Sequence, residues 1–209
     1  MKDVFDSRPR RLSAVAFPVA VGLVAWMILP SAGLADHHEK KEGEHGHSHA
    51  EGAKDLAPDF GVAILRPTKG SKVRGQLRLV ETGDRLRIMG RVSNLTPGKH
   101  GFHIHEFGDA RSNDGKSSGG HYNPEGHEHG GPGEMSHAGD LGNITAGDNG
   151  VAEVDVEVKG TPLHFLFGRA FVVHAGEDDL KSQPSGDAGG RVAVGVIGIG
   201  NKEWTRPKQ

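Results

Sequence analysis

The chain has 209 residues, a formal net charge of −2 and no cysteine. Without cysteine there are no disulfides, thiolate metal sites, cysteine nucleophiles or redox dithiols, so any metal must be held by histidine, aspartate or glutamate. A mildly acidic chain also has no electrostatic reason to bind nucleic acid.

Residues 1–35 have the pattern of a secretory signal peptide. Four basic residues within positions 1–11 precede an uncharged apolar run from Leu12 to Leu29, and small residues lead to Ala35. We therefore expect cleavage after Ala35 and export to a periplasmic or extracellular space. The apolar run of 18 residues is also close to the length of a spanning helix, so an uncleaved membrane anchor is the alternative. The pair Arg10-Arg11 fits a twin-arginine signal less well than the general secretory route.

Residues 36–58 form a charged segment that contains five histidines and a single large apolar residue, Leu56. Such a segment cannot bury enough surface to offset its ordering entropy, so we expect it to be disordered. A tail that gathers metal ions and a solvated linker are both consistent with this composition.

From Asp59 onward, short runs rich in valine, isoleucine and phenylalanine are separated by turn signals. The runs cover residues 60–67, 73–82, 85–95, 100–107, 151–158, 168–174 and 191–200. Several alternate apolar and polar residues, as strands with one buried face do, and no helical period is convincing. We predict one all-β domain at 59–201, an antiparallel sandwich or barrel of about eight strands, followed by a C-terminal extension at 202–209.

Two segments interrupt this pattern, at residues 108–140 and 175–190. Both are rich in glycine and polar residues, and the first is too long for an ordinary connection. Long loops in a compact β domain are usually functional or disordered. The first loop contains several histidines, so a bound metal would supply ordering energy that its composition lacks.

His103 and His105 are one residue apart in a predicted strand. Alternation places both side chains on one face, about 6.5–7 Å apart, where two imidazoles can converge on one ion. Neutral imidazole is the commonest protein ligand for copper and zinc. His174, at the end of another predicted strand, could supply a further ligand.

The first loop carries a second set of ligands: His121, His129, His137 and Asp140. Three imidazoles and a carboxylate suit a closed tetrahedral zinc site, which leaves no position for a substrate and is therefore structural.

Five segments resemble the signature segments of copper,zinc superoxide dismutases: GFHIHEFGD, GGHYNPEGHEHGGP, HAGDLGNITA, GRAFVVHAGEDDL and GGRVAVGVIGIG. The resemblance runs from about Phe60 to Ile199. It implies an eight-stranded Greek-key barrel with a long metal-binding loop and a long electrostatic loop. With its signal segment and no cysteine, the chain is most similar to an exported, bacterial-type member.

The resemblance implies a role for each matched residue. The implied copper ligands are His103, His105, His121 and His174. The implied zinc ligands are His121, His129, His137 and Asp140, so that the ring of His121 bridges the two ions. Asp178 matches the carboxylate that links the two sites, and Arg191 matches the arginine beside the copper channel. The remaining histidines His100, His127 and His164 match no ligand position, so we expect surface or structural roles for them.

The implied activity is dismutation of superoxide to dioxygen and hydrogen peroxide, with copper ion and zinc ion as cofactors. A non-catalytic copper or zinc storage protein on the same fold is the alternative, and the histidine-rich tail favours it. The presence of Arg191 argues against storage, because a storage protein needs no cation beside an open copper face. A histidine-ligated oxygenase or cupin would need a nearby carboxylate ligand, yet Glu106 is expected on the strand face opposite His103 and His105.

The chain departs from the family pattern at Gly115 and Val194, where members normally carry the cysteines of a disulfide. Loss of a native disulfide typically costs about 2–5 kcal/mol, so we expect loop order to depend more on zinc. An apolar patch similar to that of dimeric members is expected at Phe107, Gly108, Phe167, Ile197 and Ile199. Such a patch favours a homodimer, while a monomer stays open.

Overall fold

The computed structural model describes residues 57–204. The expected signal segment, nearly all of the histidine-rich tail and the last five residues of the C-terminal extension lie outside the described residues. Within them are eight strands: β1 (Phe60–Pro67), β2 (Arg74–Thr82), β3 (Arg85–Ser93), β4 (Gly98–His105), β5 (Asp140–Ala146), β6 (Val151–Lys159), β7 (Ala170–His174) and β8 (Arg191–Ile199).

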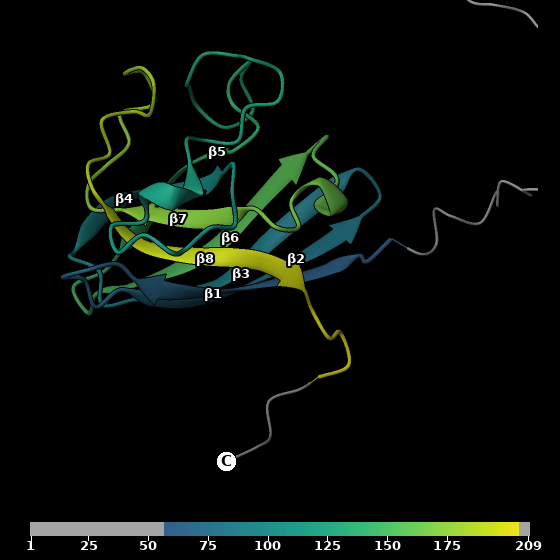
Figure 1. Ribbon diagram of the computed structural model, residues 1–209, viewed down its shortest axis with the longest axis horizontal. Helices are drawn as coiled ribbons and strands as arrows, with labels where there is room; N and C mark the ends of the chain where they lie inside the picture. The colour runs from purple at the N-terminus through teal and green to yellow at the C-terminus, as the bar shows by residue number, and fades with distance from the viewer. Residues whose placement is uncertain (1–56, 205–209) are drawn as a thin grey trace, which may run out of the picture. The chain divides into compact units, whose positions relative to one another are not determined.

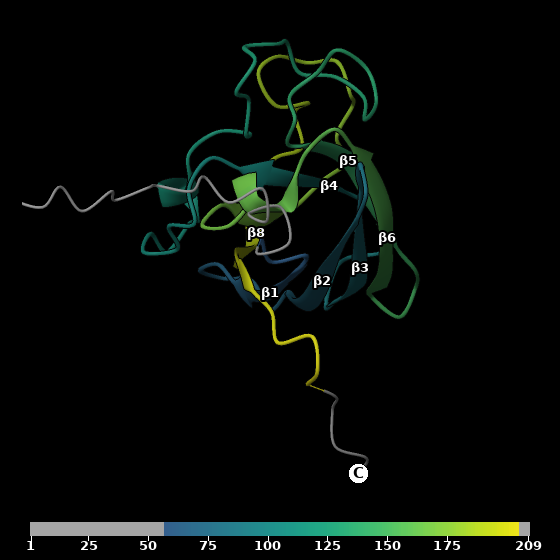
Figure 2. The same ribbon diagram turned by 90° about the vertical axis from the view of Figure 1, so that its right-hand side faces the viewer.

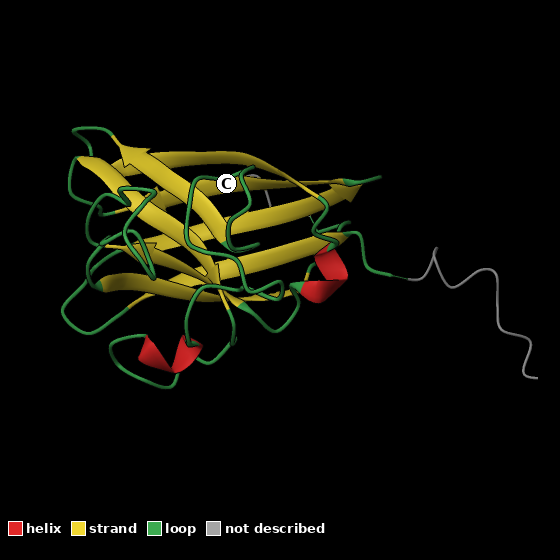
Figure 3. Cartoon of the chain, turned by 90° about the horizontal axis from the view of Figure 1, so that it is seen from above, coloured by secondary structure: helices red, strands yellow, loops and turns green. Residues whose placement is uncertain are grey.

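Among residues 57–204, helix is confined to two single turns of 3-10 type, η2 (Lys116–Ser118) and η3 (Leu163–Phe165). Both lie outside the wall of strands (Figure 3). In the part of the chain that the structure describes, no helix is long and apolar enough to cross a membrane.

All strand pairs are antiparallel, and the strand order is β5-β4-β7-β8-β1-β2-β3-β6. The chain crosses over from β3 to β4 and from β6 to β7, which gives the Greek-key connectivity. The edge strands β5 and β6 follow one another in sequence and lie close together, so the sheet nearly closes into a barrel (Figures 1 and 2). The prediction of an all-β Greek-key barrel is confirmed.

The core follows the period of two that the sequence shows. In β2 the side chains of Leu77 and Leu79 are buried, whereas those of Gln76 and Arg78 are exposed. The rings of Phe102 and Phe171 stack inside the barrel with centroids 5.2 Å apart. Each such large apolar side chain contributes about 1.5–3 kcal/mol on burial.

One residue of the expected surface patch is part of this core. Ile197 on β8 is only 1% exposed, because alternation points it into the barrel, so its assignment to the patch is wrong. Its neighbour Val196 faces outward and is 40% exposed. A surface patch does exist, and it is described below with the residues that form it.

The strand β5 was not among the seven predicted runs. Its sequence DLGNITA has only two large apolar residues, Leu141 and Ile144, and no clear alternation. Pairing with β4, in a register from Gly98 opposite Ala146 to Gly101 opposite Asn143, holds it in the sheet. Pairing with β4 therefore makes this segment a strand, although its own sequence has only a weak preference for strand.

Two long connections stand together over the outer face of β4 and β7: the 106–139 loop, which includes η2, and the 175–190 loop (Figures 1 and 2). Backbone hydrogen bonds fix both loops to the barrel wall, from Ile104 N–H to the Gly139 carbonyl and from Gly101 N–H to the Gly176 carbonyl. This face of the sheet is therefore enclosed by loops on its outer side.

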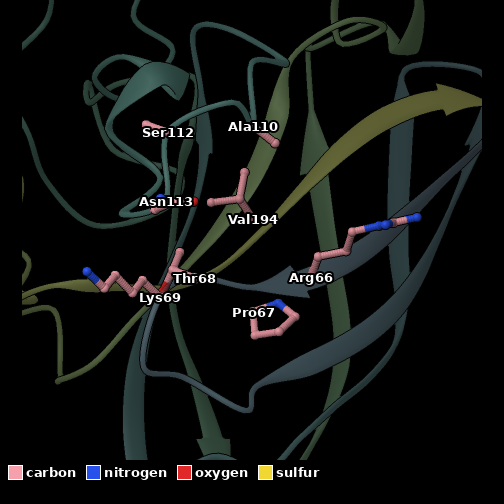
Figure 4. A pocket seen from close by; sticks show the side chains of 8 residues that line it. All are labelled: Arg66, Pro67, Thr68, Lys69, Ala110, Ser112, Asn113 and Val194. Atoms are coloured by element: carbon pink, nitrogen blue, oxygen red, sulfur yellow. The ribbon is translucent and has the colours of Figure 1, made fainter.

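Gly115 and Val194 are direct neighbours in this fold. A Cβ atom added at Gly115 would lie 2.8 Å from Cγ2 of Val194, where a disulfide would put a sulfur about 3 Å away. Val194 also borders a cleft of about 510 Å³ between the β1–β2 turn and residues 110–113, and no histidine lines it (Figure 4). Where the resemblance implies a disulfide, the structure therefore has two closely spaced positions without a covalent bond.

This geometry predicts the effect of introducing that disulfide. The double variant Gly115→Cys, Val194→Cys should raise the free energy of unfolding by about 2 kcal/mol when oxidised. Closing a loop of about 80 residues raises the free energy of unfolding by roughly 4 kcal/mol. A side chain at Gly115, whose φ is positive (76°), lowers it by about 1–3 kcal/mol.

Urea unfolding with and without a reductant measures this difference, with Val194→Cys alone as the control. Equal urea midpoints of the oxidised and reduced double variant would contradict the proximity of the two positions.

Candidate metal centre

Two of the three histidines of strand β4, His103 and His105, lie on the face away from the core. Phe102 and Ile104 lie in the hydrophobic core, and His103 and His105 point to the opposite face, as alternation predicts. Both imidazoles are fully buried because the 106–139 and 175–190 loops cover that face.

His121 reaches this face because its segment runs alongside β4. Tyr122 N–H donates to the carbonyl of Ile104 at 2.8 Å, and His105 and His121 form an isolated β-bridge. The guanidinium of Arg169 lies 3.5 Å from the centre of the Tyr122 ring, a cation–π contact on the outer side. Tyr122 is thus held between strand β4 and the guanidinium of Arg169.

Two groups of potential ligand atoms result, each within 4.8 Å of one another. The first consists of His103, His105, His121 and His174, and the second of His121, His129, His137 and Asp140. All of these side chains are buried except His137, which is half-buried. His121 is the one residue that belongs to both groups. Together the two groups contain every residue that the sequence predicted as a metal ligand.

The fit of these groups to metal ions can be tested on their ring nitrogens. Among the described residues, five buried ring nitrogens have no hydrogen-bond partner: Nδ1 of His103 and His129, and Nε2 of His105, His121 and His174. An unsatisfied buried polar atom costs about 1–3 kcal/mol, so five at one place require a ligand. Four imidazoles suit copper, and three with a carboxylate suit zinc.

The other nitrogen of each ring in the first group is hydrogen-bonded and fixes the ring. His105 Nδ1–H donates to the carbonyl of Gly119 at 2.9 Å, and His174 Nδ1–H donates to that of Gly189 at 3.1 Å. Metal-binding histidines are oriented by such partners, which set the tautomer. The free nitrogen therefore faces the centre of the group.

Asp140 lies at the middle of the second group. Its Oδ1 is 2.7 Å from Nδ1 of His121 and 3.2 Å from Nδ1 of His137. Its Oδ2 is 3.0 Å from Nδ1 of His129, off the direction of a hydrogen bond. These four groups converge on one point, as the ligands of a closed tetrahedral site do.

Asp178 spans the two groups. Its Oδ2 accepts from His103 Nε2–H at 2.7 Å, and its Oδ1 accepts from His129 Nε2–H at 3.0 Å. The side chain of Asn143 in turn binds both backbone groups of Asp178, each at 2.8 Å. The sequence reasoning missed Asn143, for which the only signal was its place in the DLGNITA segment.

Arg191 lies opposite His174 in the β7–β8 pairing. Its guanidinium is half-buried and donates to the carbonyls of Gly115 and Gly119, each at 2.7 Å. Within residues 57–204 it forms no ion pair with a carboxylate. The result is a rigid cation beside the first group.

The three histidines without an expected ligand role lie outside both groups. His100 is buried, and its Nδ1–H donates to the carbonyl of His174 at 2.8 Å, which supports the strand next to the first group. His127 is half-buried against the carbonyl of Ser136 at 3.1 Å, and His164 is exposed.

Burial keeps three histidines of the centre uncharged. It lowers the pKa of His105 to about 2, of His174 to about 3 and of His121 to about 4. For Asp178 burial acts upward, but hydrogen bonds from His103, the Leu180 N–H and His129 outweigh it and lower the pKa to about 2. Neutral imidazoles and ionised carboxylates are the forms that bind metals.

The fold and this paired arrangement define a class: a β-barrel protein with two adjoining groups of potential metal ligands that have one imidazole in common. A family model described as copper/zinc superoxide dismutase matches residues 73–197. The chain is 44% identical over 167 residues to "Extracellular superoxide dismutase [Cu-Zn]" of Onchocerca volvulus, which covers 73% of this chain and 82% of that protein.

A solved structure described as "Crystal Structure Analysis of the clock protein EA4" is similar, with a TM-score of 0.61 and 36% identity over 68% of this chain and 95% of that one. The chain therefore belongs to the copper/zinc superoxide dismutase family, whose members are enzymes that use copper and zinc.

Metal removal should make stability depend strongly on pH. In the folded apoprotein His105, His121 and His174 stay uncharged far below pH 6.5, whereas in the unfolded chain they take up protons near pH 6.5. The unfolded state then binds more protons, so the free energy of unfolding falls as pH decreases from 7 to 5. We expect a loss of at least about 2 kcal/mol, measured by urea unfolding of chelator-treated protein. A midpoint that is constant over this range would contradict the burial of these rings.

Proposed function

We propose that this protein dismutates superoxide at a copper ion held by the first group, beside a zinc ion held by the second, with His121 shared by both. The observation that carries this proposal is the orientation of one ring. Nε2 of His121 is buried without a partner on the side of the first group, and its Nδ1 lies 2.7 Å from Asp140 in the second.

The residues of the first group would hold a copper ion, whose one-electron redox chemistry would oxidise one superoxide to dioxygen and reduce the next to hydrogen peroxide. That reduction takes up two protons, of which His121 would deliver one and water the other. Because His121 is held at Nδ1 on the Asp140 side, its Nε2 can accept a proton from water and donate it to the reduced substrate while the ring keeps its orientation.

The second group has a structural task in this proposal. Its four ligand groups complete a tetrahedral set and leave no position for substrate. Asp178 fixes His103 in the first group and His129 in the second through one carboxylate. The geometry of the two sites is therefore linked through the protein as well as through His121.

Arg191 is the residue that we assign to substrate guidance. Superoxide is a small anion, and a fixed guanidinium at the edge of the first group raises its local concentration and orients it. The two hydrogen bonds to Gly115 and Gly119 keep this charge in place without neutralising it. A storage protein would have no use for such a cation, which favours the enzyme over the alternative.

The proposal predicts the behaviour of protein loaded with one copper and one zinc per chain. Such protein should consume superoxide rapidly, and Arg191→Met should lower kcat/KM by about tenfold or more and weaken its dependence on ionic strength. Arg191→Lys should be intermediate. The control is Arg78→Met, which removes an exposed charge from β2 and should leave kcat/KM close to that of the wild type. Absence of activity at full copper occupancy would eliminate the enzyme and leave the storage protein.

Export is part of the same proposal. It is supported by the basic and apolar pattern of residues 1–35 and by the extracellular relative. We assign residues 1–35 to the signal, 36–58 to the histidine-rich tail, 59–201 to the metal-binding domain and 202–209 to an extension. Periplasmic and extracellular locations are both consistent with this assignment, and contact with a membrane follows only if the first segment is retained.

A homodimer is supported by an apolar surface around the start of the 106–139 loop. Phe107 is 56% exposed, Phe165 52% and Ile199 65%. Next to Phe107, Gly108 packs against Gly168, to whose carbonyl its N–H donates at 2.6 Å. An exposed patch of this kind typically marks an interface between proteins.

We expect Ile199→Glu to convert a dimer into a monomer, because an interface would bury the new charge without a partner. Sedimentation equilibrium of the metal-loaded protein measures this. An unchanged molecular mass in the variant would locate the contact elsewhere, and a monomeric wild type would refute the dimer.

A further inference from the structure

Gln183, in the 175–190 loop, binds both backbone groups of His129. Its Oε1 accepts from the His129 N–H at 2.9 Å, and its Nε2–H donates to the His129 carbonyl at 2.9 Å. The two residues are 54 positions apart in the sequence. The amide side chain of Gln183 therefore pairs with the backbone of His129 as a neighbouring strand would. Gln183 itself is exposed, but these two hydrogen bonds are partly buried.

The same loop also holds the ring of His129. Oδ1 of Asp178 accepts from His129 Nε2–H at 3.0 Å. The backbone N–H, the carbonyl and Nε2 of His129 are thus all bound by the 175–190 loop. Only Nδ1 is left without a hydrogen-bond partner, and it faces Oδ2 of Asp140 at 3.0 Å.

Gln183 is itself held by a compact turn. Oδ1 of Asp179 accepts from the backbone N–H groups of Lys181 and Ser182 at 2.9 and 2.8 Å, and Oδ2 accepts from the Ser182 hydroxyl at 2.5 Å. Gly186 N–H donates to the Ser182 carbonyl at 2.7 Å, and Asp179 N–H donates to the Gly186 carbonyl at 2.9 Å. The segment therefore presents the amide from a fixed base.

This turn packs directly against the second group of potential ligands. A Cβ atom added at Gly186 would lie 1.8 Å from Oδ1 of Asp178 and 2.6 Å from Nε2 of His129. No side chain fits at this position, so the loop backbone covers the His129–Asp178 pair. The 175–190 loop and the second group of ligands cannot move independently.

We propose that Gln183 is a positioning residue of the zinc site. It fixes the backbone of His129 so that Nδ1 points to the centre of the second group, and it makes the order of the 175–190 loop depend on zinc. The inference rests on the proposed function, because it takes zinc as the occupant of that group. Since Gln183 acts through His129 and touches neither substrate nor metal, it is not a catalytic residue.

The linkage works in both directions. If the ordered loop favours zinc, then zinc favours the ordered loop by the same factor. The loop leads directly into Arg191, at the start of β8, so its order also bears on the position of the guanidinium. Hydrogen bonds from Gln183 thereby connect the two long loops in a chain that has no disulfide for this purpose.

Two variants separate the roles of the two amide atoms. Gln183→Met has a similar length and removes both hydrogen bonds, whereas Gln183→Glu keeps the acceptor for the His129 N–H and loses the donor to the carbonyl. Lys181→Met is the matched control, because Lys181 is exposed in the same turn and its side chain makes no hydrogen bond or ion pair among the described residues.

The full-length protein loaded with copper and zinc is mixed with a chelator, and zinc release is followed. Gln183→Met should release zinc about tenfold faster than the wild type, Gln183→Glu should lie between, and Lys181→Met should match the wild type. With Co(II) in the zinc group, the visible spectrum should shift in Gln183→Met, and amide hydrogen exchange at His129 should accelerate. A role limited to general stability would not shift the Co(II) spectrum.

Zinc release, Co(II) spectrum and His129 exchange that are all unchanged in Gln183→Met would overturn the inference, as would equal effects in Lys181→Met. If Gln183→Met fails to fold, judged by hydrogen exchange in β2 and β3, the decision passes to Gln183→Glu, whose unchanged readouts would be equally decisive against it. Failure of the proposed function is distinct, because the wild type would then bind no zinc or show no activity.

Discussion

The shared ring of His121 is the constraint around which this fold is arranged. A buried imidazole with an unpaired nitrogen is unfavourable, and here five such nitrogens converge on two points. The barrel provides a rigid wall for two of the rings on β4, and the 106–139 loop has to bring a third ring to the same face. Backbone hydrogen bonds of Tyr122 and Gly139 to Ile104 hold that loop against the wall.

Three histidines of the first group are each held by a partner that belongs to a different part of the chain. His105 is bound by the carbonyl of Gly119, His103 by the carboxylate of Asp178, and His174 by the carbonyl of Gly189. These partners lie on loops, whereas the histidines of the first group lie largely on strands. The geometry of the first group therefore depends on the order of the loops. This explains how a loop so rich in glycine and polar residues is well defined.

Alternation made seven of the eight strands predictable from the sequence, and the sequence also pointed to the residues that the structure brings together in two groups. Alternation in β4 places His103 and His105 on one face, and the same period identifies Leu77 and Leu79 as core residues. It did not reveal β5, whose place in the sheet depends on pairing with β4. A resemblance between segments supplied Asp178, and it also placed Ile197 on the surface, where alternation along β8 contradicts it.

The contacts between the loops were beyond prediction from the sequence. Asn143 and Gln183 carry no periodic signal, and their hydrogen bonds to Asp178 and His129 depend on the course of backbones far apart in the chain. The same holds for Arg169 above Tyr122. Such residues can be recognised only when the loops are seen together.

The apolar contact between Gly115 and Val194 has a consequence for the maturation of the protein. A family member with a disulfide at this place reaches its final form only after a thiol oxidant has acted, and it loses that bond in a reducing environment. This chain undergoes no such step. The thiol–disulfide balance of the compartment in which it folds therefore has no covalent bond of this chain to act on.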